Sequence, residues 1–212
     1  MVEIVPGILE KDWNEIEKKL ESIQSFAKSV HIDIIDGIFS PDHTFLDPTP
    51  FAKHSKDLFL ELHMMVENPI QYLQSFAKAG FKRFIGHIER MPNQAEFVAK
   101  AKELGEVGLA IDGPTGLSEI KVPYADLDCI LIMTIKAGKS GQEFNPEYLN
   151  KVRTILNINN SIKVEIDGGV NDRTIHQAKE SGASRFVSNS FIFNSENPQL
   201  QFNLLKDIVV PA

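Results

Sequence analysis

Short apolar runs alternate along the chain with longer amphipathic segments. Eight runs are rich in β-branched and other apolar residues and have the length of buried strands, and they span residues 3–9, 30–36, 58–65, 83–89, 107–112, 129–135, 163–169 and 185–192. Between them, apolar residues recur at helical spacing, for example over residues 11–28 and 69–80. Strands that alternate with helices predict a parallel sheet with right-handed crossovers.

The number of these repeats predicts a closed barrel. Eight strand–helix units in 212 residues fit a single (β/α)8 barrel domain over residues 1–212, at the compact end of the size range of that fold. An open doubly wound sheet is the structural alternative. It usually carries a glycine fingerprint after its first strand, and the segment VPGILEKDW lacks that spacing.

Local signals predict where several helices begin and end. Gly80, Gly105 and Gly182 each follow an amphipathic segment, where glycine commonly ends a helix. Asn171 or Asp172 is an expected N-cap of the helix before Gly182.

Composition narrows the class of protein. A net charge of −7 argues against a nucleic-acid partner, although a small phosphorylated ligand needs only a local group of backbone N–H donors. No run approaches the ~18 apolar residues of a membrane span, and the first residues do not resemble a secretory signal. The single cysteine, Cys129, lies in an apolar run, so we expect a buried thiol in a reducing, cytoplasmic setting.

Polar residues stand at the ends of three predicted strands. His31 and Asp33 share one face of their strand, His63 lies near the end of the next, and Asp167 ends the seventh. Polar residues at strand ends are often hydrogen-bonded structural groups. However, the functional rim of a barrel is formed by the carboxyl ends of its strands, and two imidazoles with two carboxylates suit a divalent ion such as Zn²⁺, Fe²⁺, Mn²⁺ or Co²⁺.

Candidate phosphate-binding segments accompany the last three strands. Glycine-rich turns follow the sixth strand, AGKSGQ (137–142), and the seventh, DGGV (167–170), and SNS (188–190) lies late in the eighth. In (β/α)8 barrels such turns commonly bind phosphate, although glycine also simply ends strands. Lys136 and Lys139 add positive charge beside the first turn, or are solvated surface lysines.

Four segments, in this order and spacing, resemble the ribulose-phosphate 3-epimerase family: HIDIIDGIFSPDHTF, ELHMMVENP, MTIKAGKSGQEF and VEIDGGVND. The resemblance runs nearly end to end and implies a (β/α)8 barrel that inverts C3 of a ketopentose phosphate. It implies that His31, Asp33, His63 and Asp167 bind one divalent metal ion, with Zn²⁺ our first choice. It also implies that Asp33 and Asp167 are the two catalytic acid–base groups.

The same resemblance implies further properties of the site and of the enzyme. It implies a cytoplasmic, homo-oligomeric isomerase of pentose phosphate metabolism, acting on a phosphorylated ketose. The substrate- and phosphate-binding residues that we predict are Gly7, Met65, Met133, Gly138, Ser140, Gly141, Gly168, Gly169, Asn189 and Ser190.

Departures from the family pattern leave the substrate open. The family usually has Ser at Gly7, Met at Ile35, His at Ile38, and Gly-Ser at Asn189–Ser190, and its Pro-Gly-Phe-Gly-Gly loop corresponds to residues 137–141. The leading prediction is epimerisation of D-ribulose 5-phosphate to D-xylulose 5-phosphate. The alternatives are a 3-epimerase of a six-carbon ketose phosphate such as allulose 6-phosphate, and a barrel that binds phosphosugars without catalysis.

Other polar residues are expected to have lesser roles. Asp36 should anchor the loop after its strand, and Asp112 should belong to a turn. His87 and Glu89, at the end of the fourth strand, should at most support the site. The remaining histidines are expected at the surface and are His43, His54 and His176.

Overall fold

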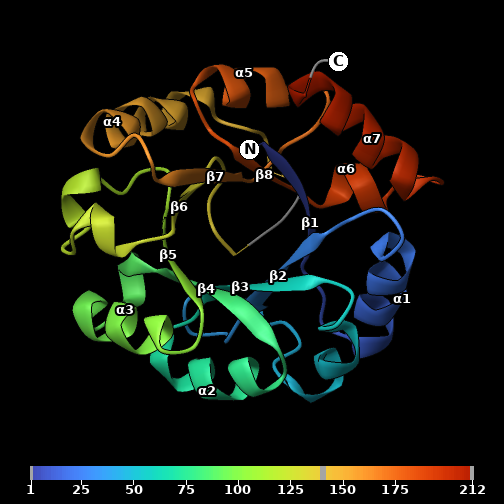
Figure 1. The fold of residues 1–212 in the computed structure, drawn as a ribbon, viewed down its shortest axis with the longest axis horizontal. Helices are drawn as coiled ribbons and strands as arrows, with labels where there is room; N and C mark the ends of the chain where they lie inside the picture. The colour runs from blue at the N-terminus through green and yellow to red at the C-terminus, as the bar shows by residue number, and fades with distance from the viewer. Residues whose placement is uncertain (1, 139–141, 211–212) are drawn as a thin grey trace.

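A computed structural model describes residues 2–138 and 142–210, and these residues form one closed barrel. Its parallel strands lie in sequence order around the ring, and β8 closes the ring by pairing with β1. Figure 1 looks into the ring of strands, with the helices arranged outside it. The strands are β1 (Glu3–Ile8), β2 (Ser29–Ile35), β3 (Phe59–Met65), β4 (Phe81–His87), β5 (Glu106–Ile111), β6 (Cys129–Met133), β7 (Lys163–Asp167) and β8 (Arg185–Ser188). The predicted (β/α)8 barrel is confirmed.

The helices cover the outside of the barrel. The α-helices are α1 (Trp13–Ile23), α2 (Ile70–Lys78), α3 (Gln94–Lys102), α4 (Asn150–Ile158), α5 (Ile175–Glu180), α6 (Ser190–Phe193) and α7 (Pro198–Val209). Short 3₁₀ helices are η1 (Thr49–His54), η2 (Ile88–Arg90), η3 (Leu117–Glu119), η4 (Tyr124–Asp126) and η5 (Pro146–Leu149).

Two of the strand connections lack the expected α-helix. The connection from β2 to β3 contains only η1, and that from β5 to β6 contains only η3 and η4, both wholly within the described residues. The first contains Pro48 and Pro50, and the second contains Pro114 and Pro123. Proline removes a backbone donor and clashes with the preceding turn, so these segments form short 3₁₀ turns instead.

The outer helices attach through apolar faces. In α1, the Asp12 side chain caps the helix by accepting from Asn14 N at 2.9 Å, and Ile16, Leu20 and Ile23 are buried against the barrel. The same arrangement of buried aliphatic and aromatic side chains continues around the ring. This layer of packed side chains holds the strands in place and so fixes the positions of their polar carboxyl-terminal residues.

Several predicted element ends shift by a few residues. The run 185–192 is split, because β8 ends at Ser188 and Ser190 already begins α6. The helix predicted to start after Asn171 or Asp172 begins at Ile175, although the Asn171 side chain does accept bonds in the preceding turn. These shifts shorten the strands and leave more residues in the loops above the barrel.

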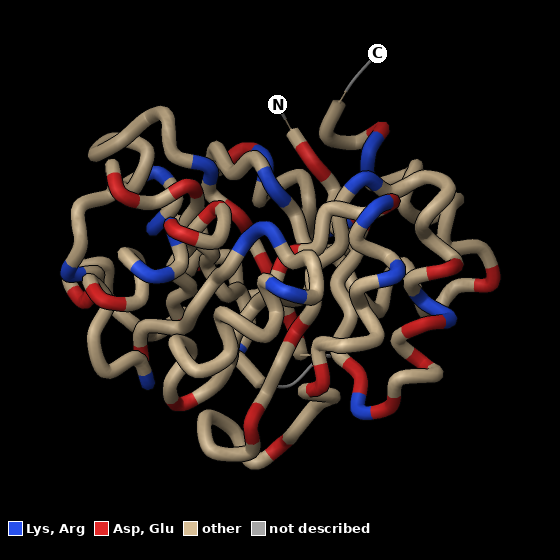
Figure 2. Tube along the Cα trace, turned by 60° about the horizontal axis from the view of Figure 1, so that its bottom comes forward, with Lys and Arg blue, Asp and Glu red and all other residues tan. Residues whose placement is uncertain are grey.

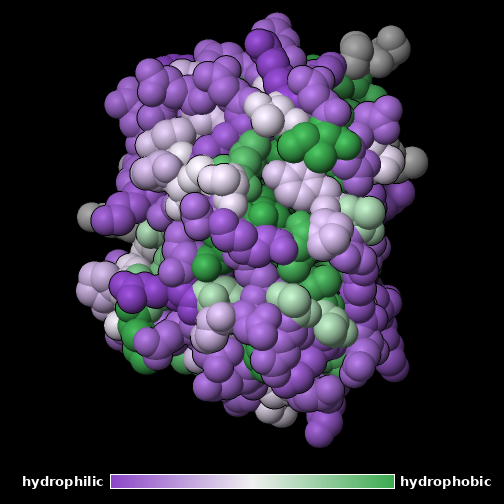
Figure 3. Space-filling view, turned by 90° about the vertical axis from the view of Figure 1, so that its left-hand side faces the viewer, coloured by the Kyte–Doolittle hydropathy of each residue, from purple (hydrophilic) through white to green (hydrophobic). Residues whose placement is uncertain are grey.

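The surface combines both signs of charge with a mostly hydrophilic exterior. Figure 2 shows Lys and Arg interspersed with Asp and Glu along the chain. Figure 3 shows a mainly hydrophilic side with hydrophobic atoms recessed near its centre. In the described part of the chain, every helix is too short or too polar to cross a membrane. Cys129 is buried and free, as predicted.

Candidate active site

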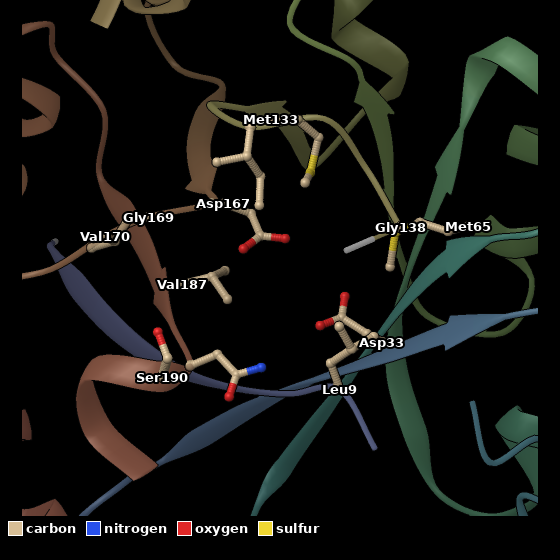
Figure 4. A pocket seen from close by; sticks show the side chains of 13 residues that line it. Leu9, Asp33, Met65, Met133, Gly138, Asp167, Gly169, Val170, Val187 and Ser190 are labelled. Carbon is tan, nitrogen blue, oxygen red and sulfur yellow. The ribbon is translucent and has the colours of Figure 1, made fainter. Parts of the chain in front are cut away.

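A cavity opens at the carboxyl ends of the strands, and Asp33 and Asp167 face one another across it (Figure 4). Side chains from β2, β3, β6, β7 and β8 and from the loops that follow contribute to its wall. The lining residues are Leu9, Asp33, Met65, Met133, Ile135, Gly138, Asp167, Gly168, Gly169, Val170, Val187, Asn189 and Ser190. The structure therefore brings most of the predicted substrate-binding residues into one cavity.

The described lining does not include three of the predicted substrate-binding residues, two of which lie outside the described part of the chain. Gly7 is not among the described residues that line the cavity, and its position packs against the wall instead: a Cβ there would lie 2.7 Å from Val187 Cγ1. Ser140 and Gly141, together with Lys139, lie outside the described residues. Lys136, next to them, is exposed.

The turn after β7 depends on its two glycines. Gly168 and Gly169 have φ values of 110° and 67°, in the region that side-chain-bearing residues rarely adopt. A Cβ at Gly168 would also lie 2.4 Å from Ile135 Cγ1. This conformation turns the chain directly after Asp167, and both glycines line the cavity.

The four predicted metal ligands converge at the bottom of the cavity. His31 and Asp33 come from β2, and the register pairs Asp33 with His63 on the adjacent β3. His31 Nε2 lies 3.3 Å from Asp33 Oδ1 and 4.0 Å from Asp167 Oδ2. His63 Nδ1 lies 2.8 Å from Asp33 Oδ1 and 3.7 Å from Asp167 Oδ2. All four ligand atoms lie within 4.8 Å of one another.

This arrangement fits a divalent ion. Ligand distances of 2.0–2.2 Å in a tetrahedral site place neighbouring ligand atoms about 3.3–3.6 Å apart, within the range found here. His31 Nε2 is buried and has no hydrogen-bond partner among the described residues. Burial alone would lower the pKa of His31, but its carboxylate neighbours raise it well above the usual range, so an ion bound at Nε2 would displace a proton from that nitrogen. His31 Nδ1 lies 2.6 Å from Glu61 Oε1, which can only accept, so the proton is on Nδ1.

The pKa values of the two carboxyl groups are shifted in opposite directions. Burial alone would raise the pKa of Asp33, but its contacts with His31 and His63 dominate and hold it at about 2. Burial and the nearby charge of Asp33 raise the pKa of Asp167 to about 6. Asp33 is thus ionised throughout the physiological range, whereas Asp167 exchanges its proton about one unit below neutral pH, and environments that separate two carboxyl pKa values in this way are typical of acid–base pairs.

A buried layer of charged side chains lies beneath these ligands. Glu61, Arg83, Glu165 and Arg185 come from β3, β4, β7 and β8 and are fully or almost fully buried. Burial alone would raise the pKa of Glu61, but Arg185, His31 and Arg83 hold it well below its usual range. Sequence reasoning missed this layer. Its signal is the alternation of Glu61 with His63 and of Glu165 with Asp167, which puts each pair on one face of a strand.

A second group of polar residues supports the rim of the site. The ring of His87 stacks on that of His63, with 4.9 Å between centroids, and its Nδ1 lies 2.9 Å from Glu89 Oε2. Glu89 Oε1 accepts from Asp112 N at 2.7 Å, and Asp112 Oδ1 accepts from Ala137 N at 2.8 Å. These contacts link a predicted ligand to the loop after β6.

The structure tests the expectations for two other polar residues. Asp36 Oδ1 accepts from the backbone N–H groups of Ile38 and Phe39, and Oδ2 accepts from Glu67 N, so its predicted role as a loop anchor is confirmed. The surface prediction for His54 is wrong: its exposed fraction is 6% because η1 folds it against the barrel. The other two histidines in that prediction, His43 and His176, are exposed.

Comparison with solved structures supports the fold. A chain titled KGPDC from Streptococcus mutans matches with a TM-score of 0.74 and 11% identity, covering 99% of this chain and 97% of that one. Phosphoribosyl anthranilate isomerase from Thermus thermophilus matches with a TM-score of 0.70 and 11% identity, covering 97% and 99%. At this identity the likeness extends to the barrel alone.

Comparison of sequences identifies the family. The chain is 30% identical over 216 residues to ribulose-phosphate 3-epimerase from Schizosaccharomyces pombe, covering 99% of this chain and 94% of the relative. It is 33% identical over 204 residues to the cytoplasmic isoform from Oryza sativa, covering 92% and 89%. The model of the ribulose-phosphate 3 epimerase family matches residues 3–193. The chain therefore belongs to the ribulose-phosphate 3-epimerase family of isomerases.

Proposed function

We propose that this enzyme epimerises C3 of a ketopentose phosphate, interconverting D-ribulose 5-phosphate and D-xylulose 5-phosphate. One observation carries the proposal: Asp33 and Asp167 enter the same cavity from β2 and β7, with pKa values shifted to opposite sides of the ordinary value. Epimerisation needs a base on one face of the reacting carbon and an acid on the other. The names of the relatives support the choice of substrate.

The two carboxyl groups perform the proton transfers. Asp33, ionised through its contacts with His31 and His63, removes the C3 proton from one face of the ketose. The resulting enediolate is flat at C3, and Asp167, whose pKa is raised to about 6, delivers a proton to the other face. In the reverse direction the two groups exchange roles. The product is therefore the C3 epimer, with one proton taken and one returned.

A divalent ion completes the proposed site. His31, Asp33, His63 and Asp167 would hold it, and the buried His31 Nε2, which has no hydrogen-bond partner among the described residues, supports this assignment. When bound, the ion acts as a Lewis acid that stabilises negative charge developing beside the reacting carbon. Imidazole and carboxylate ligands favour Zn²⁺, with Fe²⁺, Mn²⁺ and Co²⁺ as alternatives.

The other end of the cavity would bind the phosphate. Gly168 and Gly169 leave the backbone open to a close approach, and Ser190 adds a hydroxyl group to the same side of the cavity (Figure 4). Met65 and Met133 line the opposite wall, where their thioethers would pack against the sugar and exclude water. This arrangement would hold the substrate with C3 between the two carboxylates.

The domain organisation, cellular location and oligomeric state of the enzyme are further proposals. We propose that residues 1–212 form one domain and that the enzyme is a cytoplasmic homo-oligomer. One of the relatives is named a cytoplasmic isoform, which supports the location. Sedimentation of the purified protein tests the oligomer, because a monomer at micromolar concentration would contradict it.

The test is an assay of the metal-reconstituted protein with two sugars. Formation of xylulose 5-phosphate from ribulose 5-phosphate, at a higher kcat/KM than any reaction of allulose 6-phosphate, is the expected result. A preference for the longer substrate would favour the six-carbon epimerase. Binding of both phosphosugars without turnover of either would favour the non-catalytic barrel and contradict the proposal.

A further inference from the structure

We propose that Glu61 is a positioning residue for the metal site: its carboxylate holds His31 with the proton on Nδ1, so that Nε2 is presented to the ion. The inference rests on the proposed function, because it takes His31 as a ligand. It adds a role for a buried charge that lies below the cavity and outside the set of residues that line it.

The contact between Glu61 and His31 determines which ring nitrogen carries the proton. Both side chains are fully buried, and Glu61 Oε1 lies 2.6 Å from His31 Nδ1. A neutral imidazole has one donor and one acceptor nitrogen, and a carboxylate can only accept. In the neutral ring that binds an ion, donation from Nδ1 to Glu61 therefore leaves the lone pair on Nε2, the nitrogen that lies 3.3 Å from Asp33 Oδ1.

Two guanidinium groups hold Glu61 in place. Its Oε2 accepts from Arg185 Nη2 at 2.7 Å and also from Arg83 Nη1. With Oε2 occupied from β4 and β8, the carboxylate has a single orientation, in which Oε1 points at His31. The two arginines also compensate the negative charge, so Glu61 remains an acceptor at full burial.

A second buried carboxylate competes for the same proton but is less well placed. Glu165 Oε1 lies 3.2 Å from His31 Nδ1, and this oxygen has no hydrogen-bond partner in the described chain. Its Oε2 accepts from Arg185 Nε at 2.5 Å. Because Nδ1 has one proton to donate, the shorter contact identifies Glu61 as the group that orients the ring.

The chain offers a matched control on β5. Glu106 Oε2 accepts from Arg83 Nε at 2.9 Å, so Glu106 shares an arginine with Glu61. Its side chain is 38% exposed, and its ion pair in the described chain is with Arg83, not with His31. Replacing either glutamate by glutamine disturbs Arg83, but only the change at residue 61 alters the partner of His31.

The experiment measures Zn²⁺ affinity by competition with a chromophoric chelator, for the full-length wild type, Glu61→Gln and Glu106→Gln. Loss of a partner that orients a ligating histidine typically lowers metal affinity about 10–100-fold. We expect a decrease of this size in the Zn²⁺ affinity of Glu61→Gln. The Zn²⁺ affinity of Glu106→Gln should fall by less than about twofold. The visible absorption spectrum of the Co²⁺-substituted proteins is recorded in parallel. It should shift only in Glu61→Gln, because the spectrum reports the orientation of the ligands.

The outcomes separate the two proposals. Equal Zn²⁺ affinity in wild type and Glu61→Gln, or equal losses in both variants, overturns the role of Glu61 and leaves the proposed function standing. A wild type that binds no ion overturns both. If Glu61→Gln does not fold, ¹⁵N NMR of the zinc-loaded wild type decides: a protected proton on His31 Nδ1 with Nε2 bound to zinc supports the proposal, and zinc bound through Nδ1 overturns it.

Discussion

Replacing Gly7 by serine, the residue that the family usually carries there, should destabilise this chain through a contact with Val187. Gly7 lies in β1, and its φ is not positive, so a side chain meets no backbone strain. A Cβ at this position would nevertheless lie 2.7 Å from Val187 Cγ1 and 3.7 Å from Asn189 Cβ. The cost of the substitution is thus concentrated in one contact between β1 and β8.

The distance sets the size of the effect. Carbon atoms in contact normally lie about 3.5–4.0 Å apart, so the serine Cβ would overlap Val187 by about 1 Å. Val187 is 3% exposed and β-branched, so it cannot easily turn away. Overpacking of this kind costs about 1–3 kcal/mol, and for a chain of this size each kcal/mol lowers Tm by about 2–4 °C.

A double-mutant cycle with Val187→Ala tests the cause. Free energies of unfolding are measured by urea titration for the wild type, Gly7→Ser, Val187→Ala and the double variant. If the clash is the cause, the double variant should be more stable than the sum of the single effects predicts, by about 1 kcal/mol or more. Gly7→Ala is the control and should match Gly7→Ser, because both add the same Cβ. Additive effects, or a Gly7→Ser protein as stable as the wild type, would refute the reasoning.

Three further predictions follow from burial, backbone conformation and pKa. Gly168→Ala should destabilise the fold by about 2 kcal/mol more than Gly37→Ala, as measured by urea titration. Both glycines have positive φ, so both substitutions strain the backbone, but only a Cβ at residue 168 would also clash with the side chain of Ile135, at 2.4 Å. Cys129 should resist alkylation in the folded protein and react only after unfolding, because burial raises the pKa of its thiol; rapid native labelling, followed by mass spectrometry, would contradict this. In the metal-free protein the pKa of Asp167 is raised to about 6, so protonation of this carboxyl group stabilises the folded state relative to the unfolded state. The stability it contributes is complete below pH ~4 and is lost as pH rises through 6, by at most about 1.4 kcal/mol per pH unit. Urea titrations across this range should show the decline in the wild type and not in Asp167→Asn.

The alternation of strands and helices could be predicted from the sequence because apolar residues recur at a different spacing in strands than in helices. The eight strand runs predict the barrel, since parallel strands need crossovers and each crossover adds a repeat. The structure differs from the prediction where proline or glycine residues prevent the element that the apolar pattern predicts. Prolines leave η1 in place of a helix after β2, and glycines end β7 at Asp167 before the apolar run is complete.

Site residues could be predicted from the sequence only where a polar residue stands within an apolar strand, near the carboxyl end of that strand. His31, Asp33, His63 and Asp167 meet that condition, and they converge. The charged layer beneath them was missed because the pairing of Glu61 with Arg185 joins β3 to β8, which are not neighbours in the sheet. Such contacts cross the interior of the closed barrel, so no regular spacing of residues along the chain predicts them.

The most direct test of catalysis by two carboxylates is the fate of the C3 hydrogen in D2O. The metal-reconstituted enzyme is incubated with ribulose 5-phosphate, and C3 is followed by NMR, with Asp33→Asn and Asp167→Asn alongside. We predict xylulose 5-phosphate carrying deuterium at C3, because the proton that is returned comes from a carboxyl group that has exchanged with solvent. Neither variant should form it at a comparable rate, although each remains folded. Product that retains the original C3 proton, or wild-type turnover in either variant, would contradict the mechanism.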